Sequence, residues 1–346
     1  MVGAVGHRLQ ANKYIVEEVL GQGGFGITYK AIHVPSDQPV VIKTANEHLK
    51  NDPDYTRYLK RFVGEARLML NLSQKPNSHL VRLRDLFDEG ETPYLVMDFV
   101  AGQSLLELVQ QQGALSEEEA CGYIYPVGEA LTVMHKAGLV HRDAYPGNFI
   151  LPGNGKAILV DFSIAGGIVP SDYFVGTGFA PYEQMEGSCE PTVDVYYLAA
   201  TLYYAVTGQR PTTSFDRKLY QVELAPPKQL NPSISDKLNQ AILKGMALEA
   251  KDRPPSMQEW LGLLEKPKAV SPSLEPGESR EDIIPSSQET LDFFYQPKTP
   301  QKIKLPWVRL LTAFIGYALI GILLPSSVMV AGVVALVVAG VGAAGA

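Results

Sequence analysis

Short runs of apolar residues alternate with polar stretches through the first hundred residues of the chain, and this pattern predicts β-strands. Val, Ile and Leu dominate the runs, and glycine, proline or aspartate occurs between neighbouring runs, as in strands joined by turns. The predicted strands cover residues 14–20, 27–34, 39–44, 80–88 and 93–100. Between residues 54 and 73 the apolar residues instead recur every three or four positions, which indicates one amphipathic helix.

Beyond the last of these strands the pattern is mainly helical. Ser116 followed by Glu119 has the form of a capping box, which predicts the start of a long helix that runs through His135. Two further segments with buried or amphipathic helical patterns cover residues 194–208 and 236–247. We therefore predict an α+β fold in which a small β-rich lobe with one helix precedes a larger helical lobe.

The C-terminal end has a different composition, because residues 310–346 contain no charged side chain. This run of about 37 residues is nearly twice the ~20 that a helix needs to span a bilayer. Pro325 and the two serines after it divide the run, so we predict a helical hairpin with arms at about 308–324 and 328–346. One long tilted span is the alternative. A buried helix of a soluble core fits poorly, because no polar face interrupts the run.

The segment before this run predicts a tether. Lysines and an arginine precede the first arm, and by the positive-inside rule they place the preceding domain in the cytoplasm, at the cell membrane. Residues 265–306 are rich in Pro, Ser, Glu and Lys, which is typical of a flexible linker. Its one apolar island is Leu-Asp-Phe-Phe-Tyr at residues 291–295, a candidate for docking elsewhere.

Charge and cysteine content narrow the function classes. The net charge of −7 argues against a nucleic-acid-binding protein, which usually presents a basic face. The two cysteines, Cys121 and Cys189, lie far apart and show no metal-binding spacing. They fit a reducing compartment better than a disulfide scaffold.

A glycine-rich stretch, GQGGFG at residues 21–26, is the first candidate for chemistry. Glycines in this form let backbone N–H groups approach phosphate oxygens without a side-chain clash. The glycines are Gly21, Gly23, Gly24 and Gly26. A strand follows the stretch where a dinucleotide-binding fold would have a helix, so the stretch belongs to a hairpin.

Two charged residues extend this candidate site. Lys43 lies on the next predicted strand, from which its amino group can reach phosphates held beneath the hairpin. Glu65 lies within the predicted helix, on the face that it shares with Phe62 and Met69. Because an inward-facing carboxylate needs a partner, we expect Glu65 to pair with Lys43.

The stretch HRDAYPGNF, residues 141–149, carries Asp143 and Asn148 five positions apart. At this spacing two side chains can flank one nucleotide–metal site. Asp161 follows a short predicted strand farther along the chain and supplies another carboxylate.

The order and spacing of these motifs resemble those of the eukaryotic-like protein kinase family, in its bacterial serine/threonine branch. Asp161, followed by Phe and Ser, stands at the Asp-Phe-Gly position of that family. Glu183 in APYE and Arg253 match a pair that ties the family's large lobe together, and Asp194 matches its buried helix aspartate. The resemblance runs over residues 14–264 and implies the two-lobed protein-kinase fold.

The resemblance and the composition together predict four segments. They are an N-terminal extension (1–13), a kinase domain (14–264, with lobes at 14–98 and 103–264), a juxtamembrane linker (265–306) and one or more transmembrane helices (307–346).

The resemblance implies a catalytic role for each polar site residue. Lys43, held by Glu65, would bind the α- and β-phosphates of ATP. Asp161 and Asn148 would hold the metal, Mg²⁺ or Mn²⁺. Asp143 would accept the proton of the hydroxyl that receives the phosphate.

The resemblance also implies how the adenine ring is bound. Met97 would be the gatekeeper residue, and the backbone from Asp98 to Val100 would hydrogen-bond the base. The expected partners are ATP, protein substrates and the membrane, without nucleic acid.

The chain departs from the family pattern at several positions. Tyr145 replaces the catalytic-loop lysine, and this change removes a positive charge near the transferring phosphate, where such a charge is typically worth a few kcal/mol. Tyrosine kinases compensate with an arginine one residue before the asparagine, but that position is Gly147 here. Ser163 replaces the glycine of Asp-Phe-Gly. The segment GTGFAPYE is one residue shorter than the usual form, which changes the expected place of Thr177.

These departures leave two alternatives to a serine/threonine protein kinase. A pseudokinase would bind nucleotide or a partner and signal without transferring phosphate. A small-molecule phosphotransferase would use H-x-D-x-x-P-x-N without the lysine, a form that HRDAYPGN resembles. That second family generally lacks the network to which Glu183, Asp194 and Arg253 belong.

Overall fold

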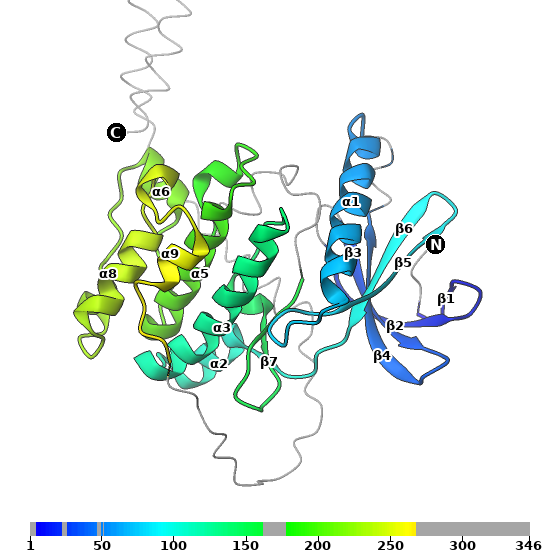
Figure 1. Ribbon diagram of the computed structural model, residues 1–346, viewed down its shortest axis with the longest axis horizontal. Helices are drawn as coiled ribbons and strands as arrows, with labels where there is room; N and C mark the ends of the chain where they lie inside the picture. The colour runs from blue at the N-terminus through cyan, green and yellow to red at the C-terminus, as the bar shows by residue number, and fades with distance from the viewer. Residues whose placement is uncertain (1–4, 23–25, 47–49, 51, 162–177, 268–346) are drawn as a thin grey trace, which may run out of the picture. The chain divides into compact units, whose positions relative to one another are not determined.

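The computed structural model describes residues 5–22, 26–46, 50, 52–161 and 178–267 (Figure 1). Several predicted features lie outside these residues: Gly23, Gly24, Ser163, Thr177, both predicted membrane arms and nearly all of the linker. Within the described part of the chain, no helix is both long and apolar enough to cross a bilayer.

The five predicted strands, together with the short β1 that was not predicted, form one antiparallel sheet of six strands in the order β1-β2-β3-β4-β6-β5. Their bounds are β1 (Arg8–Leu9), β2 (Tyr14–Gln22), β3 (Gly26–His33), β4 (Gln38–Ala45), β5 (Leu83–Glu89) and β6 (Thr92–Asp98). The pairing places Lys43 of β4 beside Thr28 of β3 and Leu95 of β6. Lys43 is thereby fixed in the middle of the sheet.

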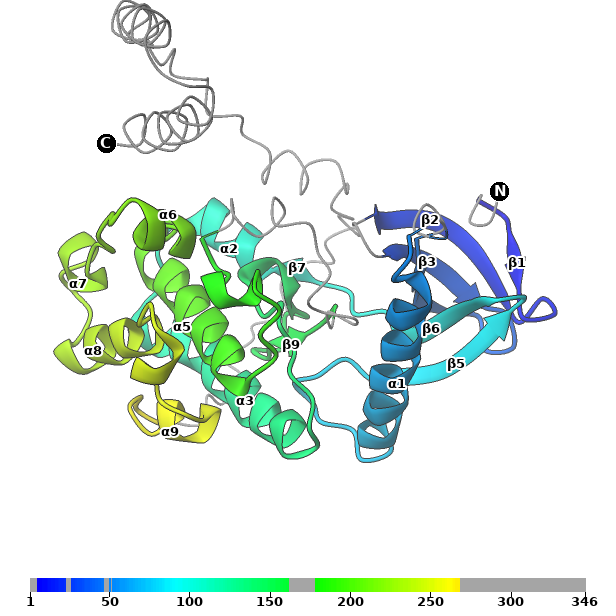
Figure 2. The same cartoon turned by 90° about the horizontal axis from the view of Figure 1, so that it is seen from above.

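The predicted helix is α1 (Tyr55–Ser73), which packs against β5 and β6 (Figures 1 and 2). Its buried side chains, Phe62, Ala66 and Met69, lie three or four positions apart, so one stripe of the helix faces the interior. The sheet and α1 form the N-terminal lobe.

The remaining elements form the C-terminal lobe (Figure 2). Its helices are α2 (Leu105–Gln112), α3 (Glu117–Lys136), α5 (Pro191–Thr207), α6 (Ser214–Leu219), α7 (Pro227–Leu230), α8 (Asp236–Gly245) and α9 (Met257–Leu261). A small sheet in the order β7-β8-β9 joins Gln103–Ser104, Phe149–Leu151 and Ile158–Leu159. Short 3-10 turns occur at Pro146–Asn148, Tyr182–Gln184 and Ala250–Asp252. The α+β class and the two lobes agree with the prediction.

The start of α3 confirms a local signal in the sequence. Ser116 is the N-cap residue, and its hydroxyl accepts a hydrogen bond of 3.2 Å from the backbone N–H of Glu119. Ser104 caps α2 in the same way, with Glu107 returning the bond to the Ser104 backbone. Such caps satisfy backbone donors that the first helical turn leaves open.

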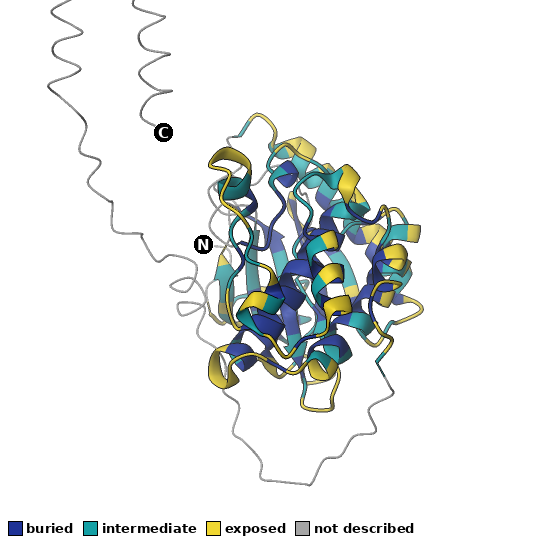
Figure 3. Ribbon diagram, turned by 90° about the vertical axis from the view of Figure 1, so that its left-hand side faces the viewer, coloured by how far each residue is buried: buried dark blue, intermediate teal, exposed yellow. Residues whose placement is uncertain are grey.

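Helix α5 is the centre of the C-terminal lobe. Every residue from Val193 to Thr207 is buried, because the helix is apolar on all sides and contacts α3, α8 and α9. Figure 3 shows buried residues in dark blue and exposed residues in yellow over the described part of the chain. Asp194 is the one charged residue of helix α5, and its carboxylate has no exposed surface. A charge at this depth has to be paired or hydrogen-bonded, and its partners lie in the candidate site.

Candidate active site

The loop between α3 and β8 brings Asp143 and Asn148 together, as their spacing predicts. The Asn148 amide donates hydrogen bonds to the Asp143 backbone carbonyl at 2.8 Å and to Asp143 Oδ2 at 3.0 Å. The 3-10 turn at Pro146–Asn148 shortens the path between the two residues. Asn148 is buried, so its amide has a fixed orientation, and the amide oxygen stays available as a metal ligand.

The environment of Asp143 favours its protonated form. Burial raises the pKa of this carboxyl well above its ordinary value, and the negative charge of Asp161 raises the pKa further. Lys43 and the hydrogen bond from Asn148 act in the opposite direction. A carboxylate that binds a proton more readily than a free aspartate is suited to accept one from a hydroxyl.

Lys43 and Asp161 approach each other from the two lobes. The Lys43 amino group donates to Asp161 Oδ1 at 2.5 Å. Asp161 has a backbone φ of +53°, a conformation that non-glycine residues rarely adopt. Asp161 and Asn148 are the two oxygen donors that would hold Mg²⁺, an ion that typically takes one or two protein ligands and completes its shell with phosphate and water. The donor set therefore fits that ion.

The described contacts of Glu65 are with two arginines, and its expected pair with Lys43 stays a prediction. Glu65 accepts two hydrogen bonds of 2.9 Å from Arg142 Nη2 and one of 3.0 Å from Arg61 Nε. Arg142 belongs to the catalytic loop, so its contact with Glu65 links α1 to the C-terminal lobe. Sequence reasoning missed this pair because Glu65 and Arg142 lie 77 positions apart, and only the fold brings Nη2 of Arg142 within reach of both carboxylate oxygens.

Asp194 fixes the backbone of the catalytic loop. Its carboxylate accepts from the backbone N–H groups of His141 at 2.8 Å and Arg142 at 2.7 Å, and also contacts His135 Nε2 at 2.8 Å. Burial alone would raise the pKa of Asp194, but these donors lower it below the ordinary value. Arg142 has a φ of +65°, so the bond to Asp194 stabilises a strained turn. Asp194 is thus a buried aspartate of a helix, as the resemblance implies.

The predicted pair of Glu183 and Arg253 is also present. Arg253 donates to both carboxylate oxygens of Glu183, at 2.5 and 3.1 Å, and to the backbone carbonyls of Thr192, Ala247 and Leu248. The Arg253 side chain has no exposed surface. A buried guanidinium with this many acceptors fixes the segment around Glu183 relative to the helices behind it.

Two supporting contacts were not predicted. Thr201 Oγ1 donates to the carbonyl of Ala144 at 2.8 Å, and Gln184 Nε2 donates to the carbonyl of Arg142 at 3.0 Å. Thr201 lies seven residues, or two helical turns, after Asp194 on α5, so both side chains occupy the same face. That spacing is the signal by which Thr201 could have been found. Gln184 has no comparable signal.

Tyr145 occupies the space above Gly147. A β-carbon added at Gly147 would lie 2.4 Å from Cε2 of Tyr145 and 2.7 Å from its Cζ and hydroxyl oxygen. The ring is 6.3 Å from the ring of Phe179. A side chain at position 147, such as the arginine of tyrosine kinases, cannot fit while the Tyr145 ring is there. The two departures from the family pattern are therefore one structural unit.

The described residues expected around the nucleotide lie on the four strands β2, β3, β4 and β6 and in the segment after β6. Met97 is buried in β6, and the Asp98 carboxylate contacts Arg84. Val100 is partly buried and packs against the main core. At Gly26 an added β-carbon would lie 2.7 Å from the Thr44 carbonyl oxygen, so the backbones of β3 and β4 require glycine there.

At Gly21, in contrast, no atom lies within 4 Å of an added β-carbon. This glycine therefore borders open space.

Comparison with known proteins agrees with the motifs. The family model described as "Protein kinase domain" matches residues 14–262. A probable serine/threonine-protein kinase of Clostridium perfringens is 31% identical over 274 residues, which cover 75% of this chain and 39% of that protein. The serine/threonine-protein kinase PknL of Mycobacterium tuberculosis is 31% identical over 209 residues, covering 58% of this chain and 51% of PknL. The chain thus spans about half or less of the length of these relatives.

Solved structures show the same fold. A structure titled "PpkA-294 apo form" covers 76% of this chain and 99% of its own, with 25% identity and a TM-score of 0.59. A structure of Rad53 with AMP-PNP, at 22% identity and a TM-score of 0.58, is alike in fold.

Proposed function

The chain belongs to the protein kinase family, and from this premise we propose that it is a serine/threonine protein kinase that transfers the γ-phosphate of ATP to protein hydroxyls. The observation that carries the proposal is the hydrogen-bonded pair of Asp143 and Asn148, held on a loop that the buried Asp194 fixes. Lys43 and Asp161 meet beside this pair. The relatives named as serine/threonine kinases support the choice of acceptor.

Each residue contributes a distinct step. Asp143 accepts the proton of the attacking hydroxyl, and its raised pKa suits that transfer. Lys43 supplies positive charge to the phosphates. Asn148 and Asp161 would hold Mg²⁺, which when bound neutralises phosphate charge. The Glu183–Arg253 tie positions the segment that precedes α5, where a peptide acceptor would lie.

Tyr145 lowers or retunes the rate in this proposal. A phenol ring cannot supply the positive charge of the lysine that it replaces, and its contact with Gly147 excludes a compensating arginine. The Glu65–Arg142 pair favours a second candidate, a pseudokinase that binds nucleotide or a partner, because both carboxylate oxygens of Glu65 accept from an arginine of the other lobe.

One experiment separates the candidates. Phosphate incorporation from ATP and Mg²⁺ is measured into the full chain and into a generic protein acceptor, with Asp143→Ala and Tyr145→Lys beside the unchanged protein. Incorporation that Asp143→Ala abolishes supports the kinase. Nucleotide binding without incorporation in all three proteins refutes it and supports the pseudokinase. Incorporation into small hydroxyl compounds alone would indicate the small-molecule phosphotransferase.

We further propose that the uncharged run at residues 310–346 anchors the chain in the cell membrane with the kinase domain on the cytoplasmic side. The measurement is sedimentation of the full chain with membranes after a carbonate wash, beside a chain that ends at residue 306. Equal recovery of both chains in the soluble fraction would refute the anchor.

A further inference from the structure

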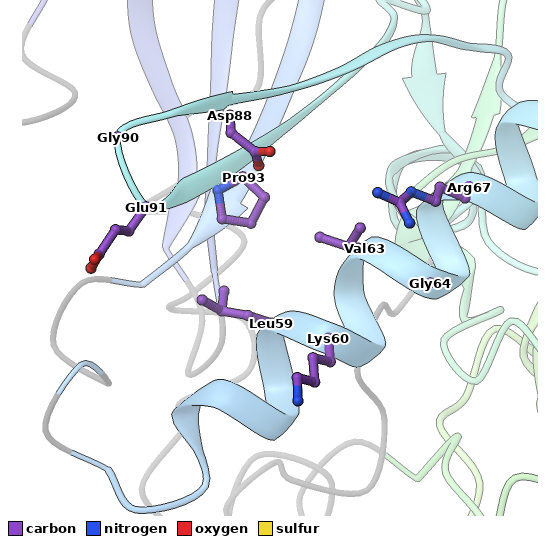
Figure 4. A pocket seen from close by; sticks show the side chains of 9 residues that line it. All are labelled: Leu59, Lys60, Val63, Gly64, Arg67, Asp88, Gly90, Glu91 and Pro93. Carbon is purple, nitrogen blue, oxygen red and sulfur yellow. The ribbon is translucent and has the colours of Figure 1, made fainter.

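Recognition of a protein acceptor requires a surface beside Asp143, because the hydroxyl that receives the phosphate has to reach that carboxylate. The hollow on the N-terminal lobe is not such a surface, since the residues that line it come from α1 and the β5–β6 hairpin (Figure 4). The C-terminal lobe offers a different candidate. The loop 208–213, which joins α5 to α6, packs against the segment 178–183, where a peptide acceptor would lie.

Two contacts hold this loop and the start of α6 against the acceptor segment. A β-carbon added at Gly178 would lie 2.5 Å from the backbone carbonyl oxygen of Pro211, so the two backbones are in close contact. Ser214, at the start of α6, donates from its hydroxyl to the carbonyl of Ala180 at 2.7 Å. Arg210 directly precedes Pro211 in the chain. It therefore lies at the edge of the acceptor segment.

A row of aromatic rings leads from the catalytic loop to Arg210. The ring of Tyr145, two residues after Asp143, lies 6.3 Å from the ring of Phe179. Phe179 in turn lies edge-on to Tyr204 at 5.8 Å, and Tyr204 is close enough to Arg210 for the two side chains to interact electrostatically. Three residues of an extended peptide cover about 10 Å. A side chain two or three residues from an acceptor hydroxyl can therefore reach Arg210.

The environment of Arg210 favours an anionic partner. Arg210 is only partly exposed, and burial lowers the pKa of its guanidinium, whereas Tyr204 raises it. Burial raises the pKa of the Tyr204 phenol more than the charge of Arg210 lowers it, so the phenol is neutral at pH 7 and adds no negative charge. A guanidinium that has lost part of its hydration gains more from a carboxylate than a fully hydrated one does. A lysine or arginine at the same place is repelled.

We propose that Arg210 determines acceptor specificity by binding an aspartate or glutamate that lies within three residues of the acceptor hydroxyl. The inference rests on the proposed function and names the substrate class of that site, acidic protein segments. Arg210 contacts the acceptor at a distance from the reacting atoms. Its contribution is therefore to binding of the acceptor, and its loss raises KM for an acidic acceptor more than it lowers kcat.

Phosphorylation of peptides by the full chain tests the assignment. The peptides share one serine in a neutral background and carry a single aspartate or lysine at each of the three positions on either side. We expect the unchanged protein to prefer aspartate over lysine at least tenfold in kcat/KM at one or more positions, about the contribution of one charge-assisted hydrogen bond. Arg210→Gln should remove this preference, and Arg210→Glu should reverse it. The same kcat/KM for aspartate and lysine peptides in the unchanged protein would overturn the proposal.

Lys228→Gln is the matched control. Lys228 lies on α7, where it pairs with Asp236, and its substitution removes one positive charge from the same lobe. The preference for aspartate should be unchanged in this variant. Equal effects of Arg210→Gln and Lys228→Gln would assign the preference to net charge and overturn the proposal. A slower rate with every peptide alike, at an unchanged preference, would show that Arg210 only supports the loop, and would overturn it as well.

Binding separates a failure of this proposal from a failure of the proposed function. Fluorescent versions of the same peptides carry alanine in place of the serine, and their affinity for the full chain is measured by anisotropy. Tighter binding of the aspartate peptides, reversed by Arg210→Glu, supports the assignment even if the unchanged protein transfers no phosphate. Phosphate transfer without a charge preference would leave the proposed function standing and overturn the role of Arg210. Equal or absent binding of both peptide sets, together with no preference in transfer, would overturn that role too.

Discussion

Gly147→Ala tests whether Tyr145 and Gly147 act as one unit. The added β-carbon would lie 2.4 Å from Cε2 of Tyr145, whereas ordinary contacts between such atoms begin near 3.4 Å. The ring has to move by about 1 Å, and this movement weakens its contact with Phe179. Insertions into packed sites typically cost 1–3 kcal/mol, so we expect a loss of about 2 kcal/mol in the free energy of unfolding. Gly147 does not have a left-handed backbone, so the cost arises from space rather than from backbone strain.

The assay is urea denaturation of the full chain as a double-mutant cycle. Tyr145→Lys removes the ring, and in that background Gly147→Ala should cost less than about 0.5 kcal/mol. The difference between the two backgrounds, about 1.5 kcal/mol, is the coupling between the residues. Phosphate incorporation is measured in parallel, with the expectation that Tyr145→Lys increases it. The same cost for Gly147→Ala in both backgrounds would refute the reasoning.

Three further predictions concern buried charges. Asp143→Asn should abolish phosphate transfer and yet raise the urea midpoint at pH 7. Because the folded-state pKa of Asp143 lies above 3.8, the ionised carboxylate destabilises the fold at neutral pH, and the gain should disappear as the pH falls through that pKa toward 3.8. A midpoint gain independent of pH would contradict this. Arg253→Met should cost about 3–5 kcal/mol in urea denaturation by leaving Glu183 buried without its partner, and adding Glu183→Met should recover part of the loss. No recovery in the double variant would argue against a paired role. Asp194→Asn should reduce phosphate transfer more than it weakens nucleotide binding, because it weakens the hydrogen bonds that hold the catalytic loop. Nucleotide binding is measured by titration calorimetry and phosphate transfer by a kinase assay. Equal losses in both would contradict the role of Asp194 in holding the loop.

Many elements of both lobes could be predicted because local patterns determine them, whereas the short β1, α2, α6, α7 and α9 were not predicted. Short apolar runs bounded by glycine, proline or aspartate mark the strands, and the spacing of Phe62, Ala66 and Met69 marks the buried face of α1. Ser116 marks the start of α3 through a bond to a residue three positions away. Such signals depend only on neighbours in the sequence, and the fold adds little to them.

The residues that make up the site could also be predicted, but not all of the contacts between their side chains. Asp143 and Asn148 meet because a short turn connects them. Glu65, in contrast, accepts hydrogen bonds from Arg142, and this contact depends on where α1 lies relative to the other lobe. The sequence shows which charged residues are present, whereas the distances between elements in the fold determine which of them form ion pairs.

The fit between Tyr145 and Gly147 shows a further limit. When the sequence is compared with the family pattern, Tyr145 and Gly147 look like two independent departures. The contact between them appears only when the ring is placed above the glycine. Whether a side chain fits at position 147 depends on where the Tyr145 ring lies, and the folded loop determines that place.

The burial of α5 on every side has a consequence for synthesis of the chain on the ribosome. Its apolar surface is covered in part by α8 and α9, and α9 ends at Leu261, about 54 residues after α5 ends at Thr207. At ~5–20 residues per second, that interval lasts roughly 3–11 s. During this time the part of α5 that later contacts α8 and α9 is an exposed apolar surface on the nascent chain, and a chaperone would be needed most at this stage. A nonsense codon before residue 257 should therefore yield an aggregating fragment rather than a smaller folded one.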